Sequence, residues 1–213
     1  MRQPGGSLRS IIQHFAAGVV FSVAAVELLP EIMARHLPFE VGAGFALGVA
    51  AMLGLRSFSR RLERSNESRG GSGALLVPVG IDLAVDGLLL GVGFAAGAKQ
   101  GFLLTAALAL ELASLGIAVS TMLRSGGASV LSSVRRVGLV SLLLPVAALL
   151  GSTVMRGLSQ EAMELVLAFG LAALLYLVTE ELLVEAHEEP ETPTAAAAFF
   201  TGFLIFLLLG MKT

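Results

Sequence analysis

The stretch SIIQHFAAGVVFSVAAVELLPEIM, residues 10–33, decides the fold because it is long and apolar and still contains two glutamates. A transmembrane helix needs about 20 mostly apolar residues. The rest of the chain has a similar character, since hydrophobic residues make up 55% of the 213 residues and charged residues only 14%. A soluble domain carries about 25% charged residues to cover its surface. The sequence therefore predicts an all-α, polytopic membrane helix bundle.

Six more apolar runs follow the first, which gives seven predicted transmembrane helices in a single domain of residues 1–213. Short polar, Gly- or Pro-containing breaks separate the runs. Only the break at about 57–73 is long, and its Ser, Gly, Arg and Glu content predicts a flexible cytoplasmic loop. The predicted spans are 10–33, 39–58, 74–98, 101–124, 136–156, 161–186 and 194–212.

Charge and cysteine content set the orientation and exclude several classes of function. One side of the membrane would collect ten Lys and Arg residues and the other side four. The positive-inside rule then predicts a cytoplasmic N-terminus and an external C-terminus, in the cell (inner) membrane. The net charge of −2 gives no basic excess for nucleic acid. The absence of Cys excludes disulfides, thiolate metal sites and cysteine nucleophiles.

The first and sixth runs share a pattern. Residues 15–31 read FAAGVVFSVAAVELLPE and residues 169–185 read FGLAALLYLVTEELLVE, so the Phe, two Glu and the Leu pair coincide. The two runs cross the membrane in opposite directions, and inverted repeats of this kind are typical of transporters with a site near the midplane. Chance similarity between Leu- and Ala-rich helices is the alternative.

Three carboxylates are predicted to meet at mid-membrane. The third and fourth runs form a hairpin that turns near residues 98–99, and Asp86 and Glu111 each lie about 12 residues, or ~18 Å, from that turn. Asp82 lies one helical turn from Asp86, and Ser114 follows Glu111 at i+3. Charged groups at this depth need a counter-charge, so protons or a metal cation must neutralise them. The alternative is three protonated acids that hold helices together by hydrogen bonds.

Further acidic and imidazole side chains lie toward the two ends of the predicted helices. We expect Glu181 to add a metal ligand to the central site. The groups nearer the cytoplasmic end predict an exit pathway, and those nearer the outer end predict an entrance. The exit residues are Glu180, Glu185, His187 and His14, and the entrance residues are Glu27 and Glu31.

Four motifs occur in a fixed order: HFAAG and ELLPE within 14–31, DLAVDG at 82–87, Glu-Leu at 111–112 and EELLVEAH at 180–187. In this order they resemble the second, fourth, fifth and seventh helices of the ZIP (Zrt/Irt-like) divalent-metal transporters. The resemblance implies a divergent, prokaryotic-type member that lacks the family's first helix, which agrees with the cytoplasmic N-terminus. It also implies a homodimer that imports a divalent metal ion.

The chain departs from the ZIP motifs at several positions. Asp82 stands where the fourth-helix His is expected, and Asp86 where its Glu is expected. Leu83, Val85 and Leu112 replace an Asn and two prolines, and the sixth-helix carboxylate has no counterpart between 137 and 155. A single all-oxygen site is therefore expected, which favours Mn²⁺, Fe²⁺ or Mg²⁺, while Zn²⁺ and Cd²⁺ also bind carboxylates.

The resulting hypothesis is a carrier that moves a divalent metal ion, its transported substrate, into the cytoplasm. Two alternatives stay open, namely a ZIP-derived membrane scaffold or regulator without transport and a proton-coupled carrier of another solute. No enzyme is expected, because the chain has no His-Glu-x-x-His motif and its three histidines all lie near predicted membrane edges.

Overall fold

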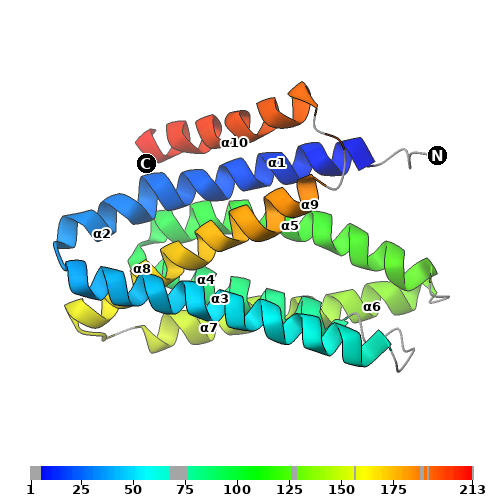
Figure 1. Ribbon diagram of the computed structural model, residues 1–213, viewed down its shortest axis with the longest axis horizontal. Helices are drawn as coiled ribbons and strands as arrows, with labels where there is room; N and C mark the ends of the chain where they lie inside the picture. The colour runs from blue at the N-terminus through cyan, green and yellow to red at the C-terminus, as the bar shows by residue number, and fades with distance from the viewer. Residues whose placement is uncertain are drawn as a thin grey trace.

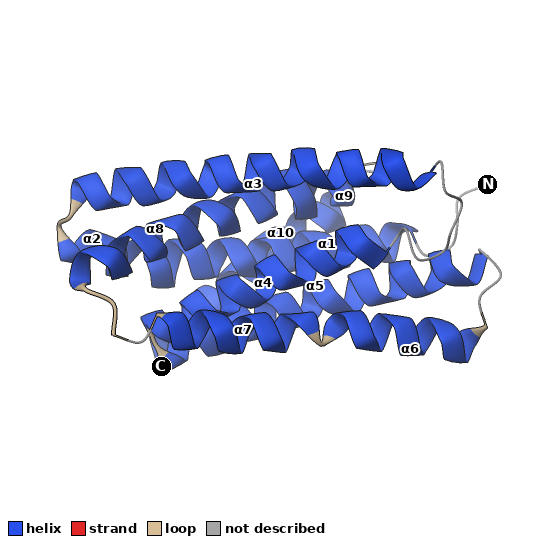
Figure 2. Ribbon diagram, turned by 90° about the horizontal axis from the view of Figure 1, so that it is seen from below, coloured by secondary structure: helices blue, strands red, loops and turns tan. Residues whose placement is uncertain are grey.

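The computed structural model describes residues 6–67, 76–125, 129–155, 157–187, 190 and 192–212, and all elements within these ranges are helices (Figures 1 and 2). The long helices lie side by side as one bundle. In chain order they are α1 (Gly6–Val23), η1 (Ala24–Leu28), α2 (Leu29–Arg35), α3 (Pro38–Glu67), α4 (Leu76–Ala96), α5 (Ala98–Ser125), α6 (Val130–Ser141), α7 (Leu143–Val154), α8 (Gln160–Tyr176), η2 (Leu177–Leu182), α9 (Leu183–Ala186) and α10 (Pro193–Lys212).

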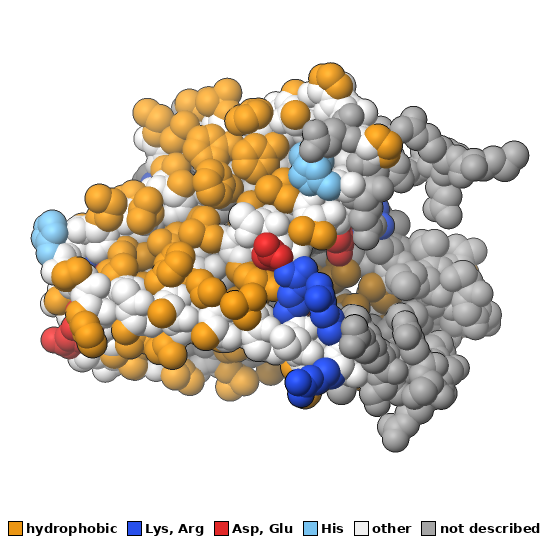
Figure 3. Space-filling view, in the orientation of Figure 1, with side chains coloured by type: hydrophobic (Ala, Val, Ile, Leu, Met, Phe, Trp, Pro, Cys, Tyr) orange, Lys and Arg blue, Asp and Glu red, His pale blue; other side chains and the backbone are white. Residues whose placement is uncertain are grey.

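Membrane character is confirmed by length and composition. Among the described residues, six helical segments are long and apolar enough to cross a membrane: 8–35, 38–61, 76–96, 130–154, 160–186 and 193–211. Helix α5 is also long, with 28 residues, but several of its side chains lie outside the described part. Apolar side chains cover much of the surface in Figure 3, as expected for helices that face lipid.

The helix ends follow local chemistry. The side chains of Ser129 and Ser159 accept hydrogen bonds from backbone N–H groups and cap the starts of α6 and α8. His36 adopts a left-handed conformation with φ 55° and ends α2. Gly97 alone separates α4 from α5, so the hairpin turns next to the predicted position.

The first part of the loop predicted at 57–73 is helical. Helix α3 continues to Glu67, because the Arg, Leu and Glu residues beyond 57 favour a helix even though they are polar overall. Residues 68–75 lie outside the described part of the chain. The prediction was wrong for residues 57–67, where polarity was taken as a sign of a loop.

Three helix pairs form the framework of the bundle: α1 with α10, α3 with α8, and α4 with α7. Glycines allow close approach in each pair. A Cβ atom at Gly202 would collide with the carbonyl of Phe15, one at Gly48 with that of Phe169, and one at Gly87 with that of Leu144. Contact of this kind through small residues is typical of helices that pack within a membrane.

Two short π-helical segments interrupt the first and sixth long helices. In η1 the N–H of Leu29 bonds to the carbonyl of Ala24, and in η2 the N–H of Leu183 bonds to that of Val178. Each segment contains a glutamate of the repeated pattern, Glu27 and Glu181 respectively. π-helical turns are rare in proteins, and those that occur are often at functional sites. These two segments are therefore candidate positions for a site.

Candidate functional site

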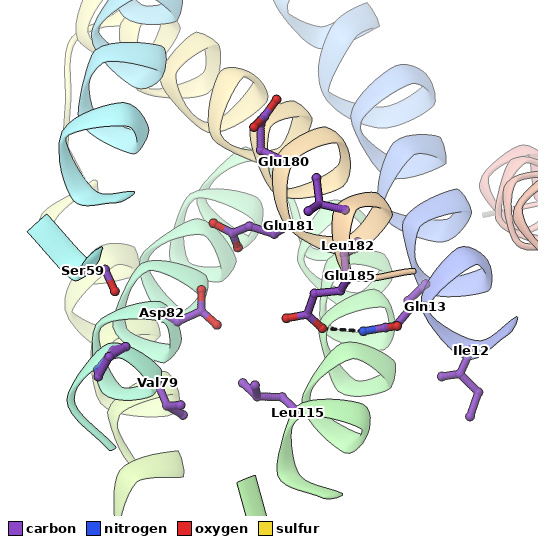
Figure 4. A pocket seen from close by; sticks show the side chains of 13 residues that line it. Ile12, Gln13, Ser59, Val79, Asp82, Leu115, Glu180, Glu181, Leu182 and Glu185 are labelled. Atoms are coloured by element: carbon purple, nitrogen blue, oxygen red, sulfur yellow. Dashed lines mark hydrogen bonds between the residues drawn. The ribbon is translucent and has the colours of Figure 1, made fainter. Parts of the chain in front are cut away.

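A polar cavity lies at the end of the bundle where α1 and α4 begin and the sixth long helix ends. It has a volume of about 300 Å³. We call this end the cavity end. Figure 4 shows side chains from α1, α3, α4, α5 and the η2–α9 segment around it. The polar lining residues are Gln13, Ser59, Asp82, Glu180, Glu181 and Glu185.

Two of the four acidic residues of the cavity are held by arginines. Arg56 of α3 forms an ion pair and a hydrogen bond with Glu180, whose carboxylate points away from Asp82 in Figure 4. Arg9 pairs with Glu185 at 3.0 Å, and Gln13 donates its Nε2 to the same Glu185 oxygen. These contacts fix the rim of the cavity and leave its inner part to the other two acids.

Asp82 and Glu181 are the inner acids. They come from α4 and η2 and point into the same space (Figure 4). Within the described residues neither forms an ion pair with Lys or Arg. Asp86, the central residue of α4, lies one turn deeper and is only 1% exposed, with no described hydrogen-bond partner for its Oδ2 atom. Asp82 and Glu181 lie near enough to act electrostatically on its carboxyl group, so three acidic side chains share one region of low dielectric constant.

Gln13 adds an unused acceptor to the same wall. The residue is 3% exposed, its Nε2 faces Glu185, and its Oε1 has no hydrogen-bond partner among the described residues. A buried amide oxygen without a donor is unfavourable unless water or a cation meets it. Asp82 and Glu181 offer carboxylate oxygen atoms suited to a hard cation.

The opposite end of the bundle, which we call the Lys99 end, holds its acids differently. Lys99 Nζ lies 3.2 Å from Glu27 Oε1, and the Glu27 side chain is only 6% exposed. Arg35 pairs with Glu31 at 2.7 Å and with Glu164 at 3.4 Å, and Glu164 is fully buried. Each predicted entrance residue therefore has a cationic partner in this conformation.

The two histidines of the predicted exit pathway lie together next to the cavity end. The rings of His14 and His187 have centroids 5.3 Å apart, and both line a smaller cavity. His14 Nδ1 is 2.8 Å from the carbonyl of Ser10, and His187 Nδ1 contacts that of Leu183. These contacts place the proton of a neutral ring on Nδ1 in each residue.

The predicted residues are thus brought together in part. Asp82, Asp86 and Glu181 share one region, with Glu180 and Glu185 at its rim, whereas Glu27 and Glu31 lie at the other end. The side chains of Glu111 and Ser114 lie outside the described part of the chain, although Leu115 on the same helix lines the cavity. Among the described side chains, no group of three His, Asp or Glu residues is close enough to hold a metal ion directly.

Sequence reasoning missed the partners of the acids: Gln13, Arg9, Arg35, Arg56 and Lys99, together with the buried Glu164. A usable signal existed for Gln13, since polar side chains inside an apolar run usually have a function. No pattern in the sequence indicates that Lys99 reaches Glu27, because the pair joins helices 72 positions apart.

No protein-family model matches the chain, and no curated protein is significantly similar to it.

Proposed function

We propose that this chain is a membrane carrier for a hydrated divalent metal cation, which binds in the cavity beside Asp82 and Glu181 and moves into the cytoplasm. The observation behind this proposal is the pair itself: two acids from different helices face one cavity, and no described Lys or Arg pairs with either. Ionised together they carry a charge that one divalent cation balances.

The size of the cavity favours an ion that keeps part of its water shell. Direct coordination by three described acidic side chains is not available. A volume of about 300 Å³ accommodates several water molecules, each of which occupies about 30 Å³ in the liquid. Mg²⁺ and similar hard ions retain waters and need only one or two carboxylates.

The paired π-helical segments support a carrier over a static scaffold. The π hydrogen bonds of η1 and η2 fall at the same position of the repeated pattern, as do the contacts of Gly202 with Phe15 and of Gly48 with Phe169. We infer that the two long helices are related as an inverted repeat, the architecture used for alternating access. As part of the same proposal, we infer that the chain is related to the ZIP transporters and forms a homodimer as they do.

Uptake into proteoliposomes tests the proposal. Vesicles that contain a metal-sensitive dye should accumulate Mn²⁺ or Zn²⁺ when they carry the wild-type chain, and Asp82→Asn or Glu181→Gln should reduce the rate at least about tenfold, since each removes charge that binds the ion. Glu161→Gln is the matched control, because Glu161 is exposed at the far end of the bundle.

Two results would contradict the proposal. If wild-type vesicles take up no divalent metal, the chain is better explained as a membrane scaffold without transport. If a pH gradient drives uptake of another solute and metal has no effect on that uptake, the chain is better explained as a proton-coupled carrier.

A further inference from the structure

Lys99 sits in surroundings typical of a bound metal cation. Its Nζ lies 3.2 Å from Glu27 Oε1 and 2.5 Å from the backbone carbonyl of Gly210, so a carboxylate and a carbonyl oxygen both meet the positive charge. Carboxylate and carbonyl oxygens are also the ligands of hard divalent ions. The Glu27 side chain is almost completely buried, which makes a cationic partner necessary there.

The chain is shaped to bring these groups together. Glycine at position 210 leaves room for the glutamate, because a Cβ atom there would lie 2.6 Å from Glu27 Oε1. Lys99 lies just beyond the turn between α4 and α5, three residues after the last residue of α4. Three separate helices, α10, the first long helix and α5, thus contribute to one small polar site.

Glu27 and Glu181 hold matching positions in the two π-helical segments but have different surroundings. Glu181 faces the open cavity without an ion pair among the described residues, whereas Glu27 is enclosed with Lys99. Glu181 thus has an open cavity beside it, and Glu27 has a lysine in the corresponding place.

We propose that Glu27 and the Gly210 carbonyl form a second divalent-cation site, in which the Lys99 ammonium stands in for the ion when this end of the bundle is closed. A metal ion and Lys99 exclude each other at Glu27. This inference rests on the proposed carrier function and adds a mechanism to it: the chain carries its own counter-charge, which stabilises the closed end while that end holds no metal.

Counting bound Mn²⁺ on the purified chain in detergent tests the site. Wild type should bind about one Mn²⁺ per chain, and Lys99→Gln about two, because loss of the ammonium leaves a buried carboxylate that needs a cation. Lys99→Arg, which keeps the charge, should remain at about one, and Lys99→Gln combined with Glu27→Gln should return to about one. A Lys99→Gln chain that binds no more Mn²⁺ than wild type overturns the inference, as does a double variant that still binds the extra ion.

A second measurement keeps the test valid should Lys99→Gln not fold. The sequence has two lysines, Lys99 and Lys212, so peptide mapping separates their reactions with an amine-specific reagent. Mn²⁺ at a concentration far above the one used for counting should increase labelling of Lys99 in wild type several-fold, since the ion then competes with Lys99 for Glu27, and Lys212 provides the internal control. Labelling of Lys99 that Mn²⁺ leaves unchanged overturns the inference.

These outcomes are distinct from failure of the proposed function. Wild type that binds about one Mn²⁺ and transports it, while Lys99→Gln gains no site, removes only the second site. Wild type that neither binds nor transports metal removes the carrier function itself.

Discussion

The two ends of the bundle contain the same local motif, a glutamate in a π-helical segment, but they neutralise it in different ways. At the Lys99 end, Glu27 is buried and paired with a lysine from another helix. At the cavity end, Glu181 is partly exposed and faces Asp82 across a space of about 300 Å³. The motif alone therefore does not determine whether its glutamate can bind a metal ion. A basic side chain from a neighbouring helix determines this, because it can occupy the carboxylate. The two ends can therefore be tested against each other.

The largest difference is expected between two arginines, one at each end. Arg35→Ala leaves the fully buried Glu164 without its ion-pair partner, which should lower the free energy of unfolding by about 3 kcal/mol. Arg9→Ala removes a pair whose side chains are 42% and 46% exposed, and should lower it by less than about 1 kcal/mol. Chemical unfolding in detergent micelles measures both. Equal losses would show that the Lys99 end is no more tightly closed than the cavity end.

The second largest effect is expected from metal binding at the cavity end. At a free Mn²⁺ concentration of about 100 times Kd, a ligand that binds only the folded state adds about 2.7 kcal/mol to the free energy of unfolding. Wild type should show the corresponding rise in Tm, and a chelator should reverse it. The double variant Asp82→Asn with Glu181→Gln should lose the rise, while Glu161→Gln should keep it. A rise of the same size in the double variant would place the Mn²⁺ elsewhere.

Helix packing should behave alike in both halves, in contrast to the charges. Gly48→Ala and Gly202→Ala each force a Cβ against a neighbouring backbone carbonyl, so each should cost about 1–3 kcal/mol. Gly54→Ala is the control, because no atom of the described residues lies within 4 Å of a Cβ there, and better helix propensity should stabilise the variant by up to about 1 kcal/mol. Thermal unfolding compares the three. A large cost at only one of Gly48 and Gly202 would mean that the two halves are not packed equivalently.

Much of the fold could be predicted from the sequence, because it depends on local composition. Apolar runs of membrane length set the order of the long helices, and Gly97 set the position of the hairpin turn. The prediction of a loop was wrong for residues 57–67, since polar residues that favour helices extend α3 beyond the expected membrane edge to Glu67.

The candidate site could be predicted only as a set of acids. Burial cost singled out Asp82, Asp86 and Glu111, because a carboxylate inside an apolar run is rarely without a function, and Glu181 was added to them as a further ligand. Their partners depend on contacts between distant segments, such as Arg56 with Glu180 or Lys99 with Glu27. The reach of a long basic side chain across a helix interface leaves no periodic signal in the sequence. The π-helical turns were also not predicted, because the two segments differ in composition around their shared glutamate.

The smallest expected effects, and the most direct comparison of the two ends, come from the two equivalent glutamates. Glu27→Gln leaves Lys99 without its counter-charge and should cost about 1–2 kcal/mol, less than a fully buried pair because the Lys99 side chain is 33% exposed. Glu181→Gln removes a carboxyl group whose repulsion by Asp82 and Glu185 outweighs its attraction to Arg56, so it should change the free energy of unfolding by less than about 1 kcal/mol, in the stabilising direction. Both are measured by unfolding in metal-free buffer. Opposite signs at matching positions would establish that the acid at the Lys99 end is neutralised by its lysine while the acid at the cavity end is available to a cation. A loss of stability in both variants would mean that the attraction between Glu181 and Arg56 outweighs the repulsion from the neighbouring acids.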